Sequence, residues 1–195
     1  MIEQEFRKMV TDLCKDGVQI SSSLDGCKSH LWHMATGISG ECTEFLECAN
    51  YFDDTGIFDQ ENAVEELGDI YFYLVGLVNG NENLSINHNP LNTITGTENI
   101  TKIASQIAIA GGGILDAVKK HCVYERKIDT DLVQANIDKL ISAMYKAYYI
   151  MGISHQEVIA ENTYKLVGAD NARYSTGSYS NEQAQNRSDK VNQQG

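Results

Sequence analysis

Two acidic segments of the sequence read Gly40-Glu-Cys-Thr-Glu-Phe-Leu-Glu47 and Val64-Glu-Glu-Leu-Gly-Asp-Ile-Tyr71. Each contains two carboxylates three positions apart: Glu41 with Glu44, and Glu66 with Asp69. Residues at this spacing lie on the same face of an α-helix. The apolar residues between them follow the same period and indicate a buried face. The segments therefore predict two helices that carry acidic side chains beside their core-facing residues.

Acidic groups next to a core need a compensating charge, because burying an unpaired ion costs on the order of several kcal/mol. Mg²⁺ prefers oxygen ligands and binds substrate phosphates in its remaining coordination positions. The alternative is an ordinary solvated face, since a single E-x-x-E is common on helices. The second pair favours a metal site, because successive antiparallel helices can bring both pairs together. We therefore predict that the metal and catalytic residues are Glu41, Glu44, Glu66 and Asp69.

Further segments accompany the acidic set: His30-Leu-Trp-His-Met-Ala-Thr-Gly-Ile-Ser-Gly-Glu41, Asn162-Thr-Tyr-Lys-Leu166, Arg173-Tyr-Ser-Thr-Gly-Ser-Tyr179 and Ala184-Gln-Asn-Arg187. Together with the two acidic motifs, they resemble the MazG-like all-α nucleoside triphosphate pyrophosphohydrolases, especially phage-encoded and related bacterial members. The resemblance covers residues 30–189. It implies a helical bundle that uses Mg²⁺ to hydrolyse a nucleoside triphosphate, with a dNTP as the expected substrate. The implied products are the monophosphate and pyrophosphate, from a cut between the α and β phosphates.

The resemblance also implies substrate-binding residues in the tail. Lys165 and Arg173 are similar to the family's phosphate-contacting positions, and Asn162 lies one helical turn before Lys165. Lysine binds phosphate oxygens as a point charge, and arginine binds them as a bidentate fork. The alternative for each is an exposed cation in a polar segment.

For the nucleobase we single out His30, Trp32 and His33, which precede Glu41 by two to three helical turns. His33, Gly37 and Glu41 follow one stripe of a helix, so an imidazole or indole there could stack on a base. The alternative is that these rings belong to the core.

Composition narrows the possible partners. The 195 residues carry a net charge of −12 and have a pI near 4.7, which argues against a general nucleic-acid-binding protein. No apolar run approaches the ~20 residues of a membrane span. The first residues lack a secretion signal, so we expect the cytoplasm, or the host cytoplasm for a phage-encoded protein. The five cysteines show no C-x-x-C spacing and are expected to be reduced thiols. The expected partner is the nucleotide substrate, without nucleic acid or membrane.

Helical periodicity dominates the chain and predicts an all-α fold. The expected helices are 2–15, 29–52, 60–79, 97–121, 129–151 and 154–167. A polar run after Asn79 predicts a linker. We thus expect a catalytic half over 1–80, a linker over 81–96, a second half over 97–170 and an irregular tail over 171–195.

The second half matches the first as a degenerate repeat. Phe45-Leu-Glu-Cys-Ala49 aligns with Ile114-Leu-Asp-Ala-Val118, and Ile57-Phe-Asp59 aligns with Lys127-Ile-Asp129 after a one-residue difference in loop length. In this register the four acids are replaced by Ala110, Gly113, Asn136 and Lys139. The alternative is a chance match between apolar helical patterns. A true duplication would make the chain an intramolecular pseudo-dimer, with a homodimer as the other possible assembly.

Two other functions stay open at this point. The acids could bind a magnesium nucleotide without turnover, which would make the chain a catalytically silent nucleotide-binding protein. Within the hydrolases, the substrate could instead be an alarmone or a modified nucleotide.

Overall fold

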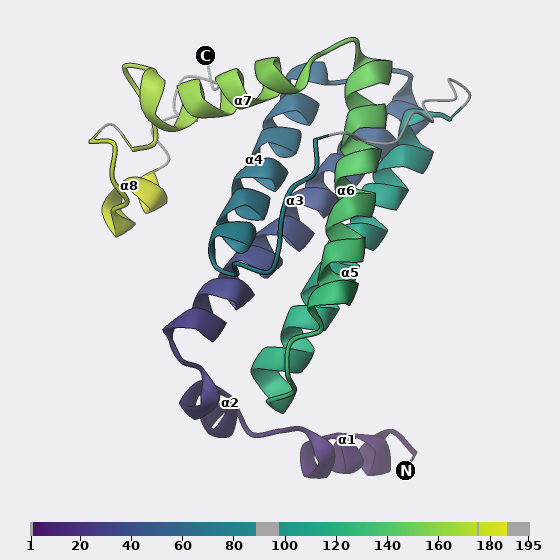
Figure 1. The fold of residues 1–195 in the computed structure, drawn as a ribbon. Helices are drawn as coiled ribbons and strands as arrows, with labels where there is room; N and C mark the ends of the chain where they lie inside the picture. Colours follow the sequence, from purple (N-terminus) through teal and green to yellow (C-terminus); the bar gives the residue numbers. More distant parts are fainter. Residues whose placement is uncertain (1, 89–97, 175, 187–195) are drawn as a thin grey trace.

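The protein is built from helices, which confirms the predicted all-α class (Figure 1). The computed structural model describes residues 2–88, 98–174 and 176–186. Its helices are α1 (Ile2–Leu13), α2 (Gly17–Ser23), α3 (Gly26–Thr55), α4 (Gln60–Asn79), α5 (Ile100–Tyr124), α6 (Thr130–Met151), α7 (His155–Thr163) and α8 (Asn181–Asn186), with a π-helical turn, η1 (Tyr164–Gly168), after α7. No helix in the described residues is long and apolar enough to cross a membrane.

The core of the bundle lies between two antiparallel hairpins, α3/α4 and α5/α6, which meet through α3 and α5. Ile38 and Phe45 of α3 and Ile107 of α5 are fully buried there. The helices approach closely at Gly111, where an added Cβ would lie 2.7 Å from Sγ of Cys42. The second hairpin thus packs on the first through its apolar residues.

The ends of the two hairpins correspond in the register proposed for the repeat. Helix α3 ends before Gly56 and α5 ends before Glu125, and both of these residues have a positive φ, 72° and 56°. The next helices begin after Asp59 and Asp129, whose side chains each accept a hydrogen bond from the backbone three residues later. Matching caps at aligned positions support a duplicated hairpin, which stays a prediction.

Helix α7 lies across α4 at one end of the bundle, and η1 continues from it (Figure 1). The sequence predicted one helix over 154–167, but the α-helix ends at Thr163 and a π-helical turn follows. Two other predictions need correction. Helix α2 was not expected, and the tail predicted to be irregular contains α8.

The described part of the predicted linker contacts the second hairpin. Gln134 of α6 accepts a hydrogen bond from the backbone N–H of Ser85 at 2.9 Å and donates one to its carbonyl at 3.0 Å. Leu84 is buried. Residues 80–88 are non-helical, as predicted, and 89–96 lie outside the described residues.

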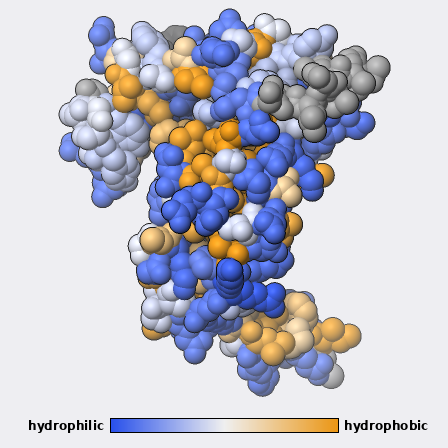
Figure 2. Space-filling model, viewed as in Figure 1, coloured by the Kyte–Doolittle hydropathy of each residue, from blue (hydrophilic) through white to orange (hydrophobic). Residues whose placement is uncertain are grey.

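Helix α1 carries an apolar stripe on the molecular surface (Figure 2). Its exposed members recur at helical spacing, and they are Ile2, Phe6, Met9, Val10 and Leu13. Lys15, just after this helix, donates a hydrogen bond to the carbonyl of Val123 at the end of α5. The N-terminal segment is therefore attached beside the second hairpin.

Adding a methyl group at Gly111 should separate α3 from α5. We expect Gly111→Ala to lower the free energy of unfolding by about 1 to 3 kcal/mol, because Cys42 is buried and has no room to move aside. Gly112→Ala is the matched control, since no atom lies within 4 Å of its added Cβ. It should be neutral or stabilising by about 0.5 to 1 kcal/mol. Denaturant unfolding of both variants measures the difference, and equal stabilities would contradict the close approach.

Residues 1–80 alone should not form a stable monomer. The fragment keeps α3 and α4 but exposes the α3 face that packs on α5, and one hairpin buries too little apolar surface to fold by itself. Circular dichroism and analytical ultracentrifugation should show an unfolded or self-associated fragment. A well-folded monomer would remove the packing role of the second half.

Candidate metal centre

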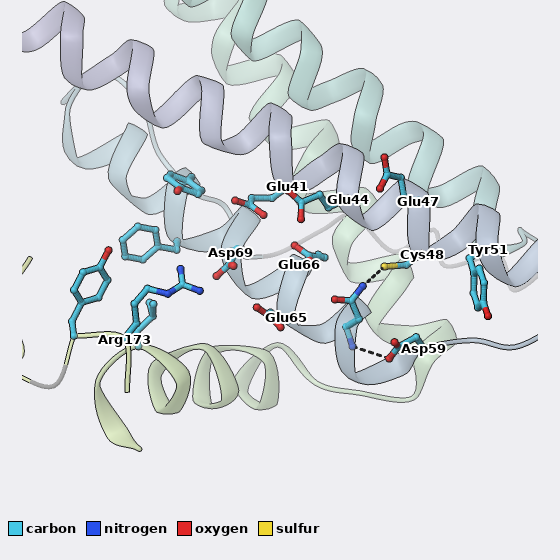
Figure 3. Close-up of a pocket in the computed structure, with 15 residues that line it drawn as sticks. Glu41, Glu44, Glu47, Cys48, Tyr51, Asp59, Glu65, Glu66, Asp69 and Arg173 are labelled. Atoms are coloured by element: carbon cyan, nitrogen blue, oxygen red, sulfur yellow. Dashed lines mark hydrogen bonds between the residues drawn. The ribbon is translucent and has the colours of Figure 1, made fainter. Parts of the chain in front are cut away.

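Three predicted acids converge between α3 and α4. Glu41 extends from α3, and Glu66 and Asp69 extend from α4, so that one carboxylate oxygen from each lies within 4.8 Å of the others (Figure 3). Glu44 lines the same pocket but lies outside this group. The hairpin geometry therefore brings the two E-x-x-E/D motifs together as the sequence predicted. The group of Glu41, Glu66 and Asp69 is the only acid or metal-ligand cluster of this kind within the described ranges.

The acids lie beside the core because each helix places apolar and acidic residues on adjoining faces. Leu67 and Ile70 of α4 are fully buried, and Glu66 beside them on the helix surface is only 6% exposed. On α3, Cys42 and Phe45 are fully buried, and the residues just before them, Glu41 and Glu44, line the pocket. Among the described residues, Glu66 is the only acidic residue that is buried.

Burial and mutual repulsion make the acidic group a weak acid. The pKa of Glu66 is raised to about 8, first by burial, then by its hydrogen bond with Glu41 and by the charge of Glu44. The pKa of Glu41 is also raised, mainly by burial and then by the charge of Asp69. Without a cation, the pair of Glu41 and Glu66 therefore retains a proton near neutral pH. A bound cation would displace that proton.

Helix α7 and η1 supply a polar wall opposite α3. Nδ2 of Asn162 donates a hydrogen bond to Asp69 at 2.6 Å, and Nζ of Lys165 lies 2.6 and 2.7 Å from the two Asp69 oxygens. Lys165 also reaches Glu65 at 3.4 Å. Gly68 permits this approach, since an added Cβ would lie 2.9 Å from Cβ of Asn162. Asn162 and Lys165 thus bind a proposed ligand, which the sequence did not predict.

The chain after η1 turns back and places Arg173 and Tyr174 at the pocket. The backbone N–H of Arg173 donates to the carbonyl of Lys165 at 3.1 Å, and that of Tyr174 donates to Leu166 at 2.8 Å. Both side chains line the pocket, and Figure 3 shows Arg173 facing it across from the α3 acids. The structure therefore brings the predicted phosphate-binding residues Lys165 and Arg173 to the acidic group.

The pocket has a volume of about 630 Å³, which is within the range of small-molecule sites. Its acidic side includes Glu44, Glu47, Asp59 and Glu65 in addition to the three converging acids. Aromatic and aliphatic side chains line the rest, and they include Phe72, Tyr73, Leu166 and Tyr174. The pocket can therefore hold a ligand that has both an anionic, metal-bound part and an apolar ring.

The predicted base-binding residues do not line this pocket. His30 bonds through Nε2 to the Gly76 carbonyl at 2.8 Å, and Trp32 packs partly buried against the core. The His33 ring meets Tyr73 edge to face, at 5.8 Å between centroids.

The helix stripe of His33, Gly37 and Glu41 does not border the pocket at His33, because the ring of Tyr73 lies against it. An added Cβ on Gly37 would overlap the Tyr73 ring, so this ring covers the stripe between His33 and Glu41. Tyr73 was not predicted as a site residue, although it lies one turn after Asp69 on the same face of α4. Burial, and then the charges of Glu41 and Asp69, raise the pKa of its hydroxyl.

The aligned positions of the second hairpin show a different arrangement. Asn136, aligned with Glu66, is buried and donates a hydrogen bond to the Leu132 carbonyl at 2.9 Å. An added Cβ on Gly113, aligned with Glu44, would lie 2.7 Å from Oδ1 of Asn136. In the second hairpin an asparagine thus lies against a glycine where the first hairpin has two of its acids, and no second metal cluster occurs in the described part of the chain.

Comparisons of the chain with protein-family models, with curated proteins and with solved structures gave no match. The chemistry of the pocket is therefore argued from its own side chains. A cluster made of carboxylate oxygens is of the kind that hard cations such as Mg²⁺ prefer.

The metal-free protein should lose stability as pH rises from about 4.5 to 8. The pKa of Glu66 in the folded state is about 8, above the ordinary value of 4.5, so the folded protein binds more protons than the unfolded chain over this range. Glu66→Gln cannot ionise and should be about 1 to 3 kcal/mol more stable than wild type at high pH. Denaturant unfolding in EDTA at pH 5 and pH 8.5 measures both effects.

The matched control is Glu61→Gln, which removes an exposed acid from the first turn of α4. It should leave the pH dependence unchanged. If the acidic group binds Mg²⁺, the ion should restore stability to the wild-type protein at pH 8.5, because a ligand that binds only the folded state stabilises it. A wild-type stability that does not change with pH would contradict the electrostatic account of Glu66.

Proposed function

We propose that the protein is a Mg²⁺-dependent nucleoside triphosphate pyrophosphohydrolase, with dNTPs as the first candidate substrates. The observation that carries this proposal is the convergence of Glu41, Glu66 and Asp69 within 4.8 Å at the edge of an open pocket. The chemistry of the opposite wall fits a nucleotide, because it presents cations and aromatic rings. The resemblance to MazG-like enzymes, drawn from the sequence, supplies the expected position of the cut.

The ligand set fits the proposed cation. Glu41, Glu66 and Asp69 would hold it, and Glu44 lies close enough to raise the pKa of both Glu41 and Glu66. When bound, Mg²⁺ supplies a Lewis acid for phosphate oxygens and a means to activate water. An acid left outside the ligand set, such as Glu44, Glu47 or Glu65, would orient or deprotonate that water.

The remaining side chains have separate roles in the proposal. Arg173 binds phosphate oxygens, and Lys165 either joins it or continues to hold Asp69. Tyr73 and Tyr174 border the pocket and offer faces on which a base can stack. Asn162 fixes the orientation of Asp69 through its hydrogen bond of 2.6 Å.

A second function has one observation in its favour. Both oxygens of Asp69 are bonded to Lys165, so this acid is already neutralised without a metal ion. If the ion pair persisted in the bound state, the site would lose a ligand and could bind a nucleotide without hydrolysing it. An alarmone or a modified nucleotide is the alternative substrate within the same chemistry.

Pyrophosphate release from canonical dNTPs and NTPs, modified dNTPs and guanosine tetraphosphate, with Mg²⁺ or with EDTA, tests these functions. We expect Mg²⁺-dependent turnover of at least one nucleoside triphosphate. Glu41→Gln, Glu44→Gln, Glu66→Gln and Asp69→Asn should each lower kcat/KM by about 100-fold or more, because each removes a charge while preserving shape.

The control Glu61→Gln should keep wild-type turnover, because Glu61 is exposed and outside the pocket. Turnover in EDTA would exclude the metal mechanism. Calorimetric binding of a Mg²⁺-nucleotide with no turnover of any compound would instead support the silent nucleotide-binding protein. Wild-type activity in one of the four variants would remove that residue from the site.

A further inference from the structure

A cluster of histidine and tyrosine rings lies at the start of α7, apart from the acidic pocket. His155 is the first residue of α7, and its ring centroid lies 4.7 Å from that of Tyr71 on α4. It lies 5.6 and 5.8 Å from Tyr145 and Tyr148 of α6. His88, from the segment before α5, lies 5.0 Å away on another side. These rings join α7 to three other parts of the chain.

The cluster holds His155 in a neutral form. Its Nδ1 atom is buried and has no hydrogen-bond partner, and the same is true of the Tyr148 hydroxyl. Burial, and then the nearby His88, lower the pKa of His155 below its ordinary value. Both ring nitrogens of His88 lie 3.3 Å from tyrosine hydroxyls, those of Tyr71 and Tyr145.

The groups that face His155 offer no stabilisation for a proton. From α4 the facing group is Tyr71, from α6 they are Tyr145 and Tyr148, and from the preceding segment it is His88. Burial raises the pKa of each of the three tyrosines, so none is negatively charged near neutral pH. On α7 itself, the Glu157 carboxylate is bonded to the backbone N–H of Ser154. The positive end of the helix dipole also disfavours an imidazolium at this position.

The same short helix connects this cluster to the acidic pocket. Asn162 lies two turns after His155 and bonds Asp69, and Lys165 follows in η1. Figure 1 shows α7 crossing the end of the bundle after α6, and this helix contacts α4. Displacing the start of α7 would therefore loosen two contacts of Asp69.

We propose that His155 is a proton-sensitive latch, whose protonation releases α7 from the bundle and frees Asp69 from Asn162 and Lys165. The docked state binds fewer protons than the undocked state, because partial burial of the docked ring disfavours its protonated form. Docking is therefore favoured above the ordinary histidine pKa of 6.5 and weakens as pH falls below it. For one proton, the docking equilibrium should change by at most about tenfold between pH 7.5 and pH 5.5.

Hydrogen–deuterium exchange of the full, metal-free chain, corrected for intrinsic exchange rates, measures this docking. Amides of residues 155–163 should lose protection several-fold between pH 7.5 and pH 5.5, and amides of α5 and α6 serve as the internal reference. In His155→Phe, which keeps a ring but cannot be protonated, protection of α7 should be the same at both pH values. His121→Asn, at the far end of α5, is the matched control and should behave like wild type.

Two results would overturn the latch. One is equal protection of wild-type α7 at both pH values, and the other is a pH dependence that persists in His155→Phe, which would assign it to the acidic pocket instead. An NMR titration of the wild-type imidazoles gives a test without substitution. The His155 ring and the α7 amides should report the same midpoint, and a titration of His155 without change in α7 would also exclude the proposal.

Discussion

The candidate site depends on the burial of one carboxylate. Glu66 sits between fully buried residues of α4, where an ionised group is unfavourable unless a proton or a cation compensates it. Glu66 shares its proton with Glu41 across the hairpin, and the pocket that both border leaves space for a cation and a ligand. The close packing of α3 on α5 fixes the hairpin that holds these acids, because Gly111 lets the two helices approach at Cys42.

Helix α7 couples the acidic pocket to the rest of the bundle. Its C-terminal half places Asn162 against Asp69 over Gly68, and its first residue inserts a histidine between two hairpins. The helix is short and packs mainly on α4, so its position depends on these few polar and aromatic contacts. In the proposed latch, the same helix therefore couples the contacts of Asp69 with Asn162 and Lys165 to the protonation of His155.

The two hairpins show how one helical pattern supports different chemistry. Their caps correspond, from Gly56 and Glu125 to Asp59 and Asp129, so the backbone geometry is shared. The first hairpin keeps large acids at its seam and leaves a pocket. The second has Gly113 and Asn136 at the positions aligned with Glu44 and Glu66, and therefore lacks these acids. This supports a division of roles, with the second hairpin acting as a packing partner for the first.

The sequence by itself determined the helical class, the approximate positions of the six expected helices and the convergence of Glu41, Glu66 and Asp69, because these follow from local periodicity, caps and the reach of a hairpin. It did not predict the π-helical turn after α7, or that Tyr73 separates His33 from the pocket. It also did not predict that Lys165 binds Asp69. Only the tertiary structure decided these features, because each depends on side chains from distant segments that compete for the same space and charge.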